Sequence, residues 1–457
     1  MLFHTWLFVV FFCIFYPVYL LVRNTKFRIP WLFIASYFFY GSWNPLYLLL
    51  ILASTSADFI AVLGMSRTGY KKLFLTLSIV FNLGLLGFFK YAGFITRNLN
   101  ALLLALGVSP IFPEPDILLP VGISFFVFQS MTYSIDFYRG KIPREPNFIR
   151  YATFVSLFPQ LVAGPIERAS NLLAQLRTIP SITKQDIGDG LSLFIVGLFK
   201  KVVMADYLAL YADRVYAAPQ NYGSLGLFLG TFAFGWQIYF DFCGYTDMAR
   251  GIGRLMGYRL MLNFNNPYLA DGLGDFWRRW HISLSTWFKD YVYIPLGGNK
   301  YGKFRTHLNM FLTMLISGVW HGANWTFITW GALHAIGRVL TRELEQTTIY
   351  RDKVPKIAKQ LLVFIFVTFT WIFFRAQTIR QAWEILSGIF EFRPGPVECP
   401  IIMMGLVLAI WAYQFMYESR FRPFLALTPV RVALVILMTI LLAIGAGSSQ
   451  PFIYFQF

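Results

Sequence analysis

The chain has 457 residues, of which 57% are hydrophobic and 13% are charged, and its mean hydropathy is +0.57. An ordinary soluble domain has about a quarter of its residues charged, so the composition excludes a soluble globular protein and predicts a polytopic membrane protein. The formal net charge of +17 would suit a nucleic-acid partner, but the basic residues lie between apolar runs and not in one stripe. We therefore interpret the charge as membrane topology and predict no nucleic-acid partner.

Apolar runs close to the ~20 residues that cross a bilayer recur along the chain. They occupy residues 2–22, 73–89, 117–137, 187–199, 224–240, 361–374, 401–416 and 430–444. Two shorter runs, 31–40 and 46–63, are separated by Gly-Ser-Trp-Asn-Pro, which predicts a hairpin turn. The first run has neither a basic leader nor a small-residue cleavage site, so we expect it to remain as an anchor. The windows predict an all-α integral membrane protein of roughly ten to thirteen membrane helices, some of them broken, in a single domain over residues 1–457.

Basic segments set the predicted orientation. Residues 23–28, 67–72, 139–150 and 250–305 are rich in lysine and arginine and should face the cytosol by the positive-inside rule, with both termini outside. The three cysteines, Cys13, Cys243 and Cys399, have neither metal nor disulfide spacing. The sequence therefore predicts no metal site.

The stretch from Gly272 to Lys300 is rich in both aromatic and basic residues. At about 100° per residue, an apolar face collects Phe276, Trp277, Trp280, Leu284, Trp287 and Phe288, and the opposite face collects Arg278, Arg279, Thr286, Lys289 and Asp290. With Asp275 as its N-cap, this pattern predicts one amphipathic helix at the cytoplasmic interface. His281 falls at the buried edge, where an imidazole needs a hydrogen-bond partner or a function. The alternative is a surface helix that only stabilises the loop.

A second histidine, His321, is placed by helix length. The sixteen residues from Arg305 to His321 give about 24 Å of helix, which is shorter than a hydrocarbon core of about 30 Å. Gly318 and Gly322 should loosen the helix and Asn324 should cap the next one, so we expect His321 at a helix break inside the membrane. Ionisable residues there are functional candidates, although a histidine that only bonds a carbonyl remains the alternative. His4, His307 and His334 are weaker candidates.

Several carboxylates fall near apolar runs. Asp241 and Asp247 come at the end of the run 224–240, and Glu167 and Arg168 follow a Gly-Pro break. Carboxylates at such places can orient a histidine or neutralise an arginine, or they can be ordinary interface charges.

Four motifs together resemble the membrane-bound O-acyltransferase (MBOAT) family, in its bacterial alginate O-acetylase AlgI-like branch. They read YFDFCGYTDMARG, NFNNPY, FWRRWHISLSTWFKDYVYIPLGGN and SGVWHGANWTFITWGALH. The resemblance covers residues 37–340, is densest over 236–334, and leaves additional C-terminal membrane helices at 361–448. It implies a multi-helix bundle around a central tunnel, with His321 of the WHG motif in the active site and His281 as its companion. Cys243 and Thr246 stand where the family usually has serine, which argues against an essential hydroxyl at position 243.

The resemblance also implies a reaction. Acetyl-CoA would enter from the cytosol as a substrate, with no permanently bound cofactor, and Arg278, Arg279, Lys289 and Lys300 would meet its phosphates. His321 would act as general base on an acceptor hydroxyl. A periplasmic or membrane-anchored hydrolase-like partner would then complete O-acetylation of an exopolysaccharide such as alginate, outside the bacterial inner membrane. Further candidate site residues are Asp275, Trp280, Trp320, Asn324, Asp241 and Asp247.

Two alternatives stay open from the sequence. Another acyl transfer, such as D-alanylation of teichoic acid, would use the same histidines on a different acceptor. A membrane transporter also has broken helices and buried charges near the midplane, although the chain lacks paired halves with matching interruptions.

Overall fold

The computed structural model describes residues 1–445, 452 and 453, and in these residues every regular element is a helix. The all-α prediction is therefore confirmed. Among the described residues, four helices are long and apolar enough to cross a membrane: Tyr47–Arg67, Lys71–Ala105, Lys356–Arg375 and Thr428–Gly445. Two shorter apolar helices are Trp6–Val22 and Ile401–Tyr417. The protein is thus a multi-pass membrane protein, and the count of ten to thirteen crossings stays a prediction.

The described chain forms two compact units, residues 1–195 with 245–261 and residues 196–244 with 262–457. Helices α10 and α12 contribute residues to both units. The single membrane-embedded domain stays a prediction, and residues 446–448 of the predicted segment 361–448 lie outside the described residues.

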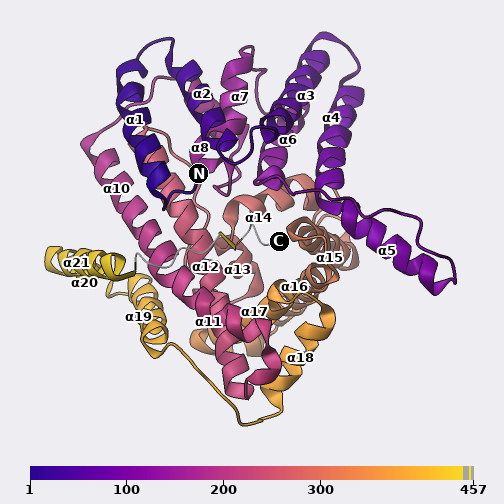
Figure 1. Cartoon of the computed structure of the whole chain (residues 1–457), viewed down its shortest axis with the longest axis vertical. Coiled ribbons are helices and arrows are strands. Elements are labelled where there is room, and N and C mark those ends of the chain that lie inside the picture. The colour runs from indigo at the N-terminus through magenta and orange to yellow at the C-terminus, as the bar shows by residue number, and fades with distance from the viewer. Residues whose placement is uncertain (446–451, 454–457) are drawn as a thin grey trace. The chain divides into compact units, whose positions relative to one another are not determined.

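The first unit is built from ten helices of the N-terminal half and the last part of α12 (Figure 1). They are α1 (Trp6–Val22), α2 (Arg28–Gly41), α3 (Tyr47–Arg67), α4 (Lys71–Leu86), α5 (Ala92–Ala105), α6 (Ile123–Tyr138), α7 (Phe148–Ser156), α8 (Phe158–Leu161), α9 (Ala174–Arg177), α10 (Lys184–Phe199) and α12 (Ser224–Leu255). Helix α2 ends at Gly41 and α3 begins at Tyr47, so the predicted turn at Gly-Ser-Trp-Asn-Pro is confirmed.

A polar cluster joins α3, α4 and α6 within this unit. Asp58 of α3 is fully buried and accepts hydrogen bonds from Ser78 and Ser130, and from Asn82 at 3.0 Å. Ser78 Oγ also lies 2.9 Å from Ser134 Oγ. Polar side chains between membrane helices act as local cross-links, because an unpaired polar group in an apolar interior is costly.

Two predicted runs have different bounds in the structure. The run 117–137 is helical only from Ile123, because Gly122 lies in the left-handed region at φ 75° and ends the preceding extended segment. Helix α12 continues from Ser224 to Leu255, so Asp241 and Asp247 follow the apolar run 224–240 but lie inside the same helix. An apolar run marks only the most hydrophobic part of a helix.

The second unit contains the remaining helices and most of the predicted site residues. They are α11 (Asp206–Ala217), α13 (Leu273–Arg279), α14 (Ile282–Phe288), α15 (Gly302–His321), α16 (Trp325–Leu344), α17 (Lys356–Arg375), α18 (Ile379–Phe390), α19 (Ile401–Tyr417), α20 (Arg422–Leu425) and α21 (Thr428–Gly445). Two π-helical segments, η3 (Lys200–Ala205) and η6 (Lys289–Tyr293), also belong to it.

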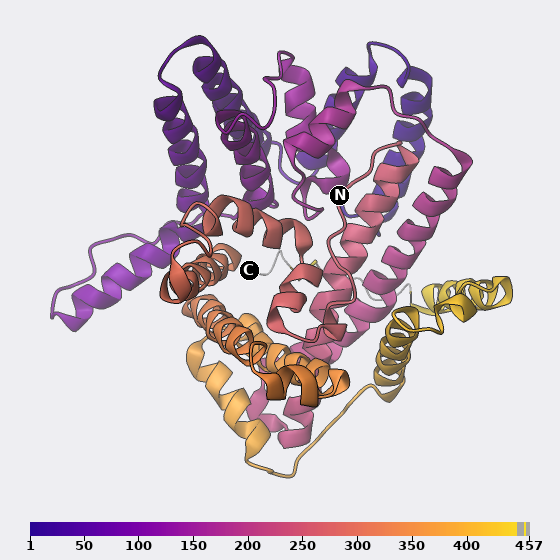
Figure 2. The ribbon, with the colours of Figure 1, turned by 180° about the vertical axis from the view of Figure 1, so that it is seen from behind.

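Helices α15 and α16 form a closely packed hairpin (Figure 2). A Cβ atom on Gly318 would collide with the Phe327 carbonyl, and one on Gly331 would lie 2.7 Å from the Met314 carbonyl. Helix α15 runs unbroken through Gly318 to His321. The prediction that Gly318 loosens the helix was therefore wrong, since its missing side chain lets α16 approach instead.

Candidate active site

The predicted amphipathic helix is broken in two at His281. Helix α13 ends at Arg279 and α14 begins at Ile282, and His281 between them adopts φ 42° and ψ 55°, in the left-handed region. The single-helix prediction was wrong, and so was the N-cap, since Gly272 takes that place and Asp275 lies in the first turn of α13.

Hydrogen bonds from the segment around Asn263 explain the break. Ile282 N–H donates to the Asn263 carbonyl at 2.9 Å, and Ser283 N–H donates to Asn263 Oδ1 at 3.2 Å. Asn265 N–H in turn donates to the Arg279 carbonyl at 2.9 Å. These bonds satisfy the backbone groups that a helix end leaves without intrahelical partners, so the chain can turn sharply at His281 without leaving buried amides unpaired.

The turn places the His281 imidazole in a fully buried aromatic surrounding. Its exposed fraction is 0%, the Phe242 ring meets it edge-on at 4.6 Å between centroids, and the Phe264 ring lies at 6.4 Å. The two seven-residue helices that flank His281 are too short to span a membrane. Burial lowers the pKa of His281 to about 3, because a charged imidazole is poorly solvated there. His281 is therefore neutral at physiological pH.

His321 is the last residue of α15 and is 6% exposed. The rings of Trp330 and Phe374 lie 5.1 and 5.2 Å from its imidazole. Helix α16 begins four residues later at Trp325, with Asn324 Oδ1 accepting from Thr326 N–H at 3.1 Å. The predicted helix break and the Asn324 cap are confirmed. Gly322, however, is packed against the Phe327 ring, so the space beside it is filled by the protein itself.

One tryptophan touches both histidines. The Trp320 ring lies 4.9 Å from the His321 ring and 6.3 Å from the His281 ring. The structure thus brings together two histidines that are forty residues apart in the sequence, around a side chain that is only 4% exposed.

A cavity of about 260 Å³ opens beside this cluster, between α13, α14, η6, α15 and α16. Its lining is largely apolar with hydroxyl groups and three cationic side chains: Gly274, Trp277, Leu284, Ser285, Phe288, Lys289, Tyr293, Met310, Thr313, Met314, Ser317, Arg338 and Arg342. An apolar pocket with a few polar groups is typical of a small-molecule site.

Single aromatic side chains connect the cavity lining to the histidine cluster. Phe288 lines the cavity, and its ring lies 6.3 Å from Trp320. Trp277 also lines it, and its ring lies 5.8 Å from Trp330, which packs on His321. One layer of rings therefore separates the cavity from the immediate neighbours of both histidines.

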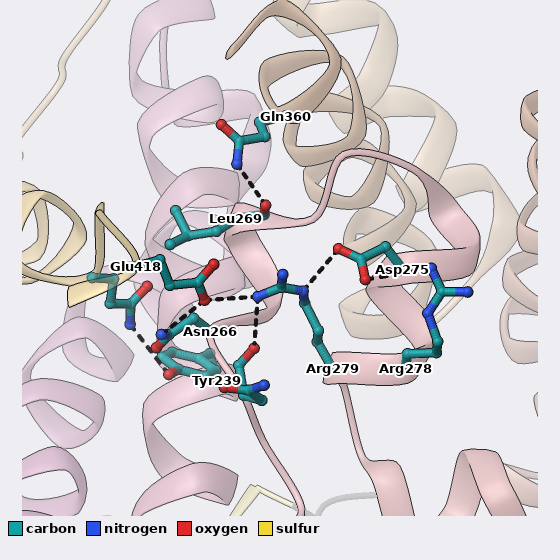
Figure 3. Close-up of polar contacts among 10 residues, drawn as sticks. Tyr239, Asn266, Leu269, Asp275, Arg278, Arg279, Gln360 and Glu418 are labelled. Atoms are coloured by element: carbon teal, nitrogen blue, oxygen red, sulfur yellow. Dashed lines mark hydrogen bonds and ion pairs between the residues drawn. The ribbon is translucent and has the colours of Figure 1, made fainter. Parts of the chain in front are cut away.

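Of the four basic residues predicted to bind donor phosphates, only Lys289 lines the cavity. Arg279 is held between two carboxylates, Asp275 at 2.8 Å and Glu418 at 2.7 Å (Figure 3). Arg278 has an exposed side chain 3.5 Å from Asp275. Lys300 is exposed and does not belong to the lining of this cavity. Arg279 is thus occupied in structural ion pairs.

Sequence reasoning missed Arg338 and Arg342 as site residues. They are four residues apart on α16, so they lie on one helix face. Arg338 is paired with Glu345 at 3.6 Å, whereas Arg342 approaches the Met310 sulfur at 3.8 Å. Their i, i+4 spacing on the helix that follows the WHG motif is the signal from which they could have been found.

The other predicted candidates have structural contacts. Trp280 is 2% exposed and packs on Trp371 at 5.0 Å. Asp241 forms a buried ion pair with Lys201 at 2.9 Å. In the first unit, Asp247 lies 3.3 Å from Arg250. Glu167, also in the first unit, accepts from Asn171 Nδ2 at 2.7 Å.

The weaker histidines also have partners. His334 is fully buried with Nε2 2.9 Å from Thr370 Oγ1, and His307 lies 3.1 Å from Glu343.

The chain is similar to known proteins over most of its length. The sequence profile of the membrane-bound O-acyltransferase family matches residues 139–380. The chain is 37% identical to a probable alginate O-acetylase AlgI of Pseudomonas putida, over 98% of this chain and 99% of that protein. It is 42% identical to a probable alginate O-acetylase AlgI of Pseudomonas aeruginosa, over 84% and 74% of the two chains. It is 38% identical to a peptidoglycan O-acetyltransferase of Helicobacter pylori, over 80% and 74%. The chain belongs to the membrane-bound O-acyltransferase family.

Proposed function

We propose that this O-acyltransferase moves an acetyl group from cytosolic acetyl-CoA toward the hydroxyl groups of an extracytoplasmic polysaccharide such as alginate. A periplasmic or membrane-anchored hydrolase-like protein completes the transfer, and the enzyme resides in the bacterial inner membrane. The observation that carries the proposal is the cavity with three cations, which Phe288 and Trp320 connect to two buried histidines. The names of the two alginate O-acetylase relatives support alginate as an example of the acceptor polysaccharide.

The cavity suits the donor because its lining combines two kinds of contact. Lys289, Arg338 and Arg342 offer charge-assisted hydrogen bonds to phosphate oxygens. Met310 and Met314 offer flexible apolar contacts to the uncharged part of the molecule. We assign the phosphate contacts to these three cations, in place of Arg278, Arg279 and Lys300.

The chemical step needs a base and a leaving group. His321 accepts the proton of the acceptor hydroxyl, whose oxygen attacks the thioester carbonyl carbon. The C–S bond then breaks, and CoA leaves as a thiolate that takes up a proton. His281 is kept neutral by burial and packs against Trp320, which in turn contacts His321. In this proposal, His281 helps to hold the reacting groups in place.

The test is to purify the protein in nanodiscs and to measure acetyl-CoA binding and acetyl transfer for wild type, His321→Ala and His321→Gln. General-base help is typically worth 10² to 10⁴ in rate, so we expect both variants to lose acetylation by about that factor while binding acetyl-CoA. Thermal stability is the folding control. Wild-type acetylation by either variant would remove His321 from the mechanism.

The alternatives are tested in the same assay. Membership in an acyltransferase family argues against the transporter alternative. Offering alginate, peptidoglycan fragments and a D-alanyl donor to the same preparation, with and without the partner protein, distinguishes the acceptors. Transfer to alginate with acetyl-CoA supports the proposal, and transfer that requires the D-alanyl donor contradicts it.

A further inference from the structure

A buried lysine lies between two buried carboxylates in the second unit. Lys201 Nζ is 2.8 Å from Asp206 Oδ1 and 2.9 Å from Asp241 Oδ1. The three residues are only 1% or 2% exposed. Two carboxylates share one ammonium group here, and buried carboxylate oxygens need hydrogen-bond donors in an apolar interior. We name these three residues the charge triad.

A backbone amide far along the chain supplies such a donor. Ile453 N–H donates to Asp241 Oδ2 at 2.7 Å across 212 positions of sequence. Phe452 and Ile453 are 0% and 1% exposed. Hydrogen bonds to an ionised carboxylate are stronger than those between neutral groups, so Asp241 holds this two-residue segment in the protein interior.

The segment in turn packs behind His281. The Phe452 ring lies 6.1 Å from the Phe242 ring, and Phe242 meets the His281 imidazole edge-on at 4.6 Å. Phe242 directly follows Asp241 in α12. A chain of contacts therefore leads from the charge triad through Ile453 and Phe452 to one face of His281.

We propose that Asp241 is a positioning residue for His281. It anchors Ile453, which keeps Phe452 against Phe242 and so fixes the imidazole relative to Trp320 and His321. The effect on acetyl transfer rests on the proposed function, whereas the anchoring of the segment does not. The competing explanation is that the charge triad only stabilises the fold.

Four variants separate these explanations. Asp241→Ala removes the acceptor, and Ile453→Pro removes the N–H donor while leaving the charge triad intact. Ile453→Val is the matched control, since it keeps the N–H group. Asp206→Asn changes the charge triad but leaves the bond from Ile453 to Asp241.

The first readout is the accessibility of the segment. Phe452→Cys is placed in a protein without Cys13, Cys243 and Cys399, and its reaction rate with a small maleimide is measured in nanodiscs. Losing a hydrogen bond to a charged group should raise the labelling rate by about 10- to 100-fold in Asp241→Ala and Ile453→Pro. Ile453→Val and Asp206→Asn should stay close to the parent protein.

The second readout is acetyl transfer with native Phe452. Misplaced catalytic groups cost on the order of 10²-fold, so Ile453→Pro should lower kcat by about that factor and leave KM for acetyl-CoA unchanged. An unchanged labelling rate in Ile453→Pro would show that Asp241 does not anchor Ile453. A raised labelling rate with wild-type kcat would show that this anchor does not position His281. Loss of thermal stability in Asp241→Ala and Asp206→Asn alike, with Ile453→Pro matching the parent protein in both readouts, would assign the charge triad to folding alone. If the parent protein transfers no acetyl group, the proposed function fails, and labelling still decides the anchor.

Discussion

At the scale of single residues, His281 combines two unusual properties, a left-handed backbone and a buried imidazole. A non-glycine residue at φ 42° is uncommon, and asparagine is the side chain that best tolerates this region. His281→Asn therefore keeps the turn while removing the titrating group. This makes it a better probe than alanine, which would add backbone strain.

His281 should make the folding stability of the protein depend on pH. Burial lowers its pKa from 6.5 to about 3, so between those values the unfolded chain binds a proton that the folded protein does not. Stability from this group is complete above pH 6.5 and falls as the pH drops toward 3, by at most about 1.4 kcal/mol per pH unit. The thermal unfolding midpoint of wild type should therefore decrease from pH 7 to pH 5 more steeply than that of His281→Asn. Parallel profiles for the two proteins would contradict the burial of a neutral His281.

Arg342 should contribute to donor binding, whereas Arg278 should not. Arg342 lines the cavity, and Arg278 has a side chain that is 73% exposed and lies outside its lining. Removing a hydrogen bond to a charged group costs about 1.5 to 3 kcal/mol, so Arg342→Gln should weaken acetyl-CoA binding by about 10- to 100-fold. Titration calorimetry in nanodiscs measures this. Arg278→Gln, which removes the same charge, is the control, and an equal loss in both variants would indicate non-specific attraction.

At the scale of elements, the hairpin of α15 and α16 depends on two glycines that face each other. Gly318→Ala should destabilise the protein by about 1 to 3 kcal/mol, because the added methyl group meets the Phe327 backbone and not a flexible side chain. Gly405→Ala is the control, since nothing lies within 4 Å of its added Cβ in the exposed part of α19. It should be neutral or stabilising by up to about 1 kcal/mol. Equal thermal midpoints for the two variants would show that α16 does not depend on the close approach.

At the scale of the whole molecule, the basic segments predict which loops face the cytosol. Lys300 lies in a basic loop, whereas Ser109 follows the 35-residue apolar helix that begins at Lys71. By the positive-inside rule these positions lie on opposite sides of the membrane. In a protein without native cysteines, Ser109→Cys should react with an impermeant maleimide in intact cells, and Lys300→Cys should react only after permeabilisation. Labelling of Lys300→Cys from outside would invert the predicted orientation.

The sequence was a good guide wherever the signal is local. Apolar runs located most of the long helices, and the turn before Tyr47 and the cap at Asn324 follow from the residues that form them. Burial of His281 also follows from its neighbours in the sequence. The break beside it does not, because the hydrogen bonds that permit it come from Asn263 and Asn265.

By itself, the sequence determined the membrane character, the all-helical class and the family, because composition, periodicity and contiguous motifs carry these properties. It also pointed to His281 and His321 as candidates. Only the tertiary structure decided which basic side chains line the cavity and which are held in ion pairs. Arg279 forms an ion pair with Glu418, 139 positions away, whereas Lys289, Arg338 and Arg342 all line the cavity. Ile453 finds Asp241 across 212 positions. The partner of a charged side chain depends on how distant helices pack, and no local pattern contains that information.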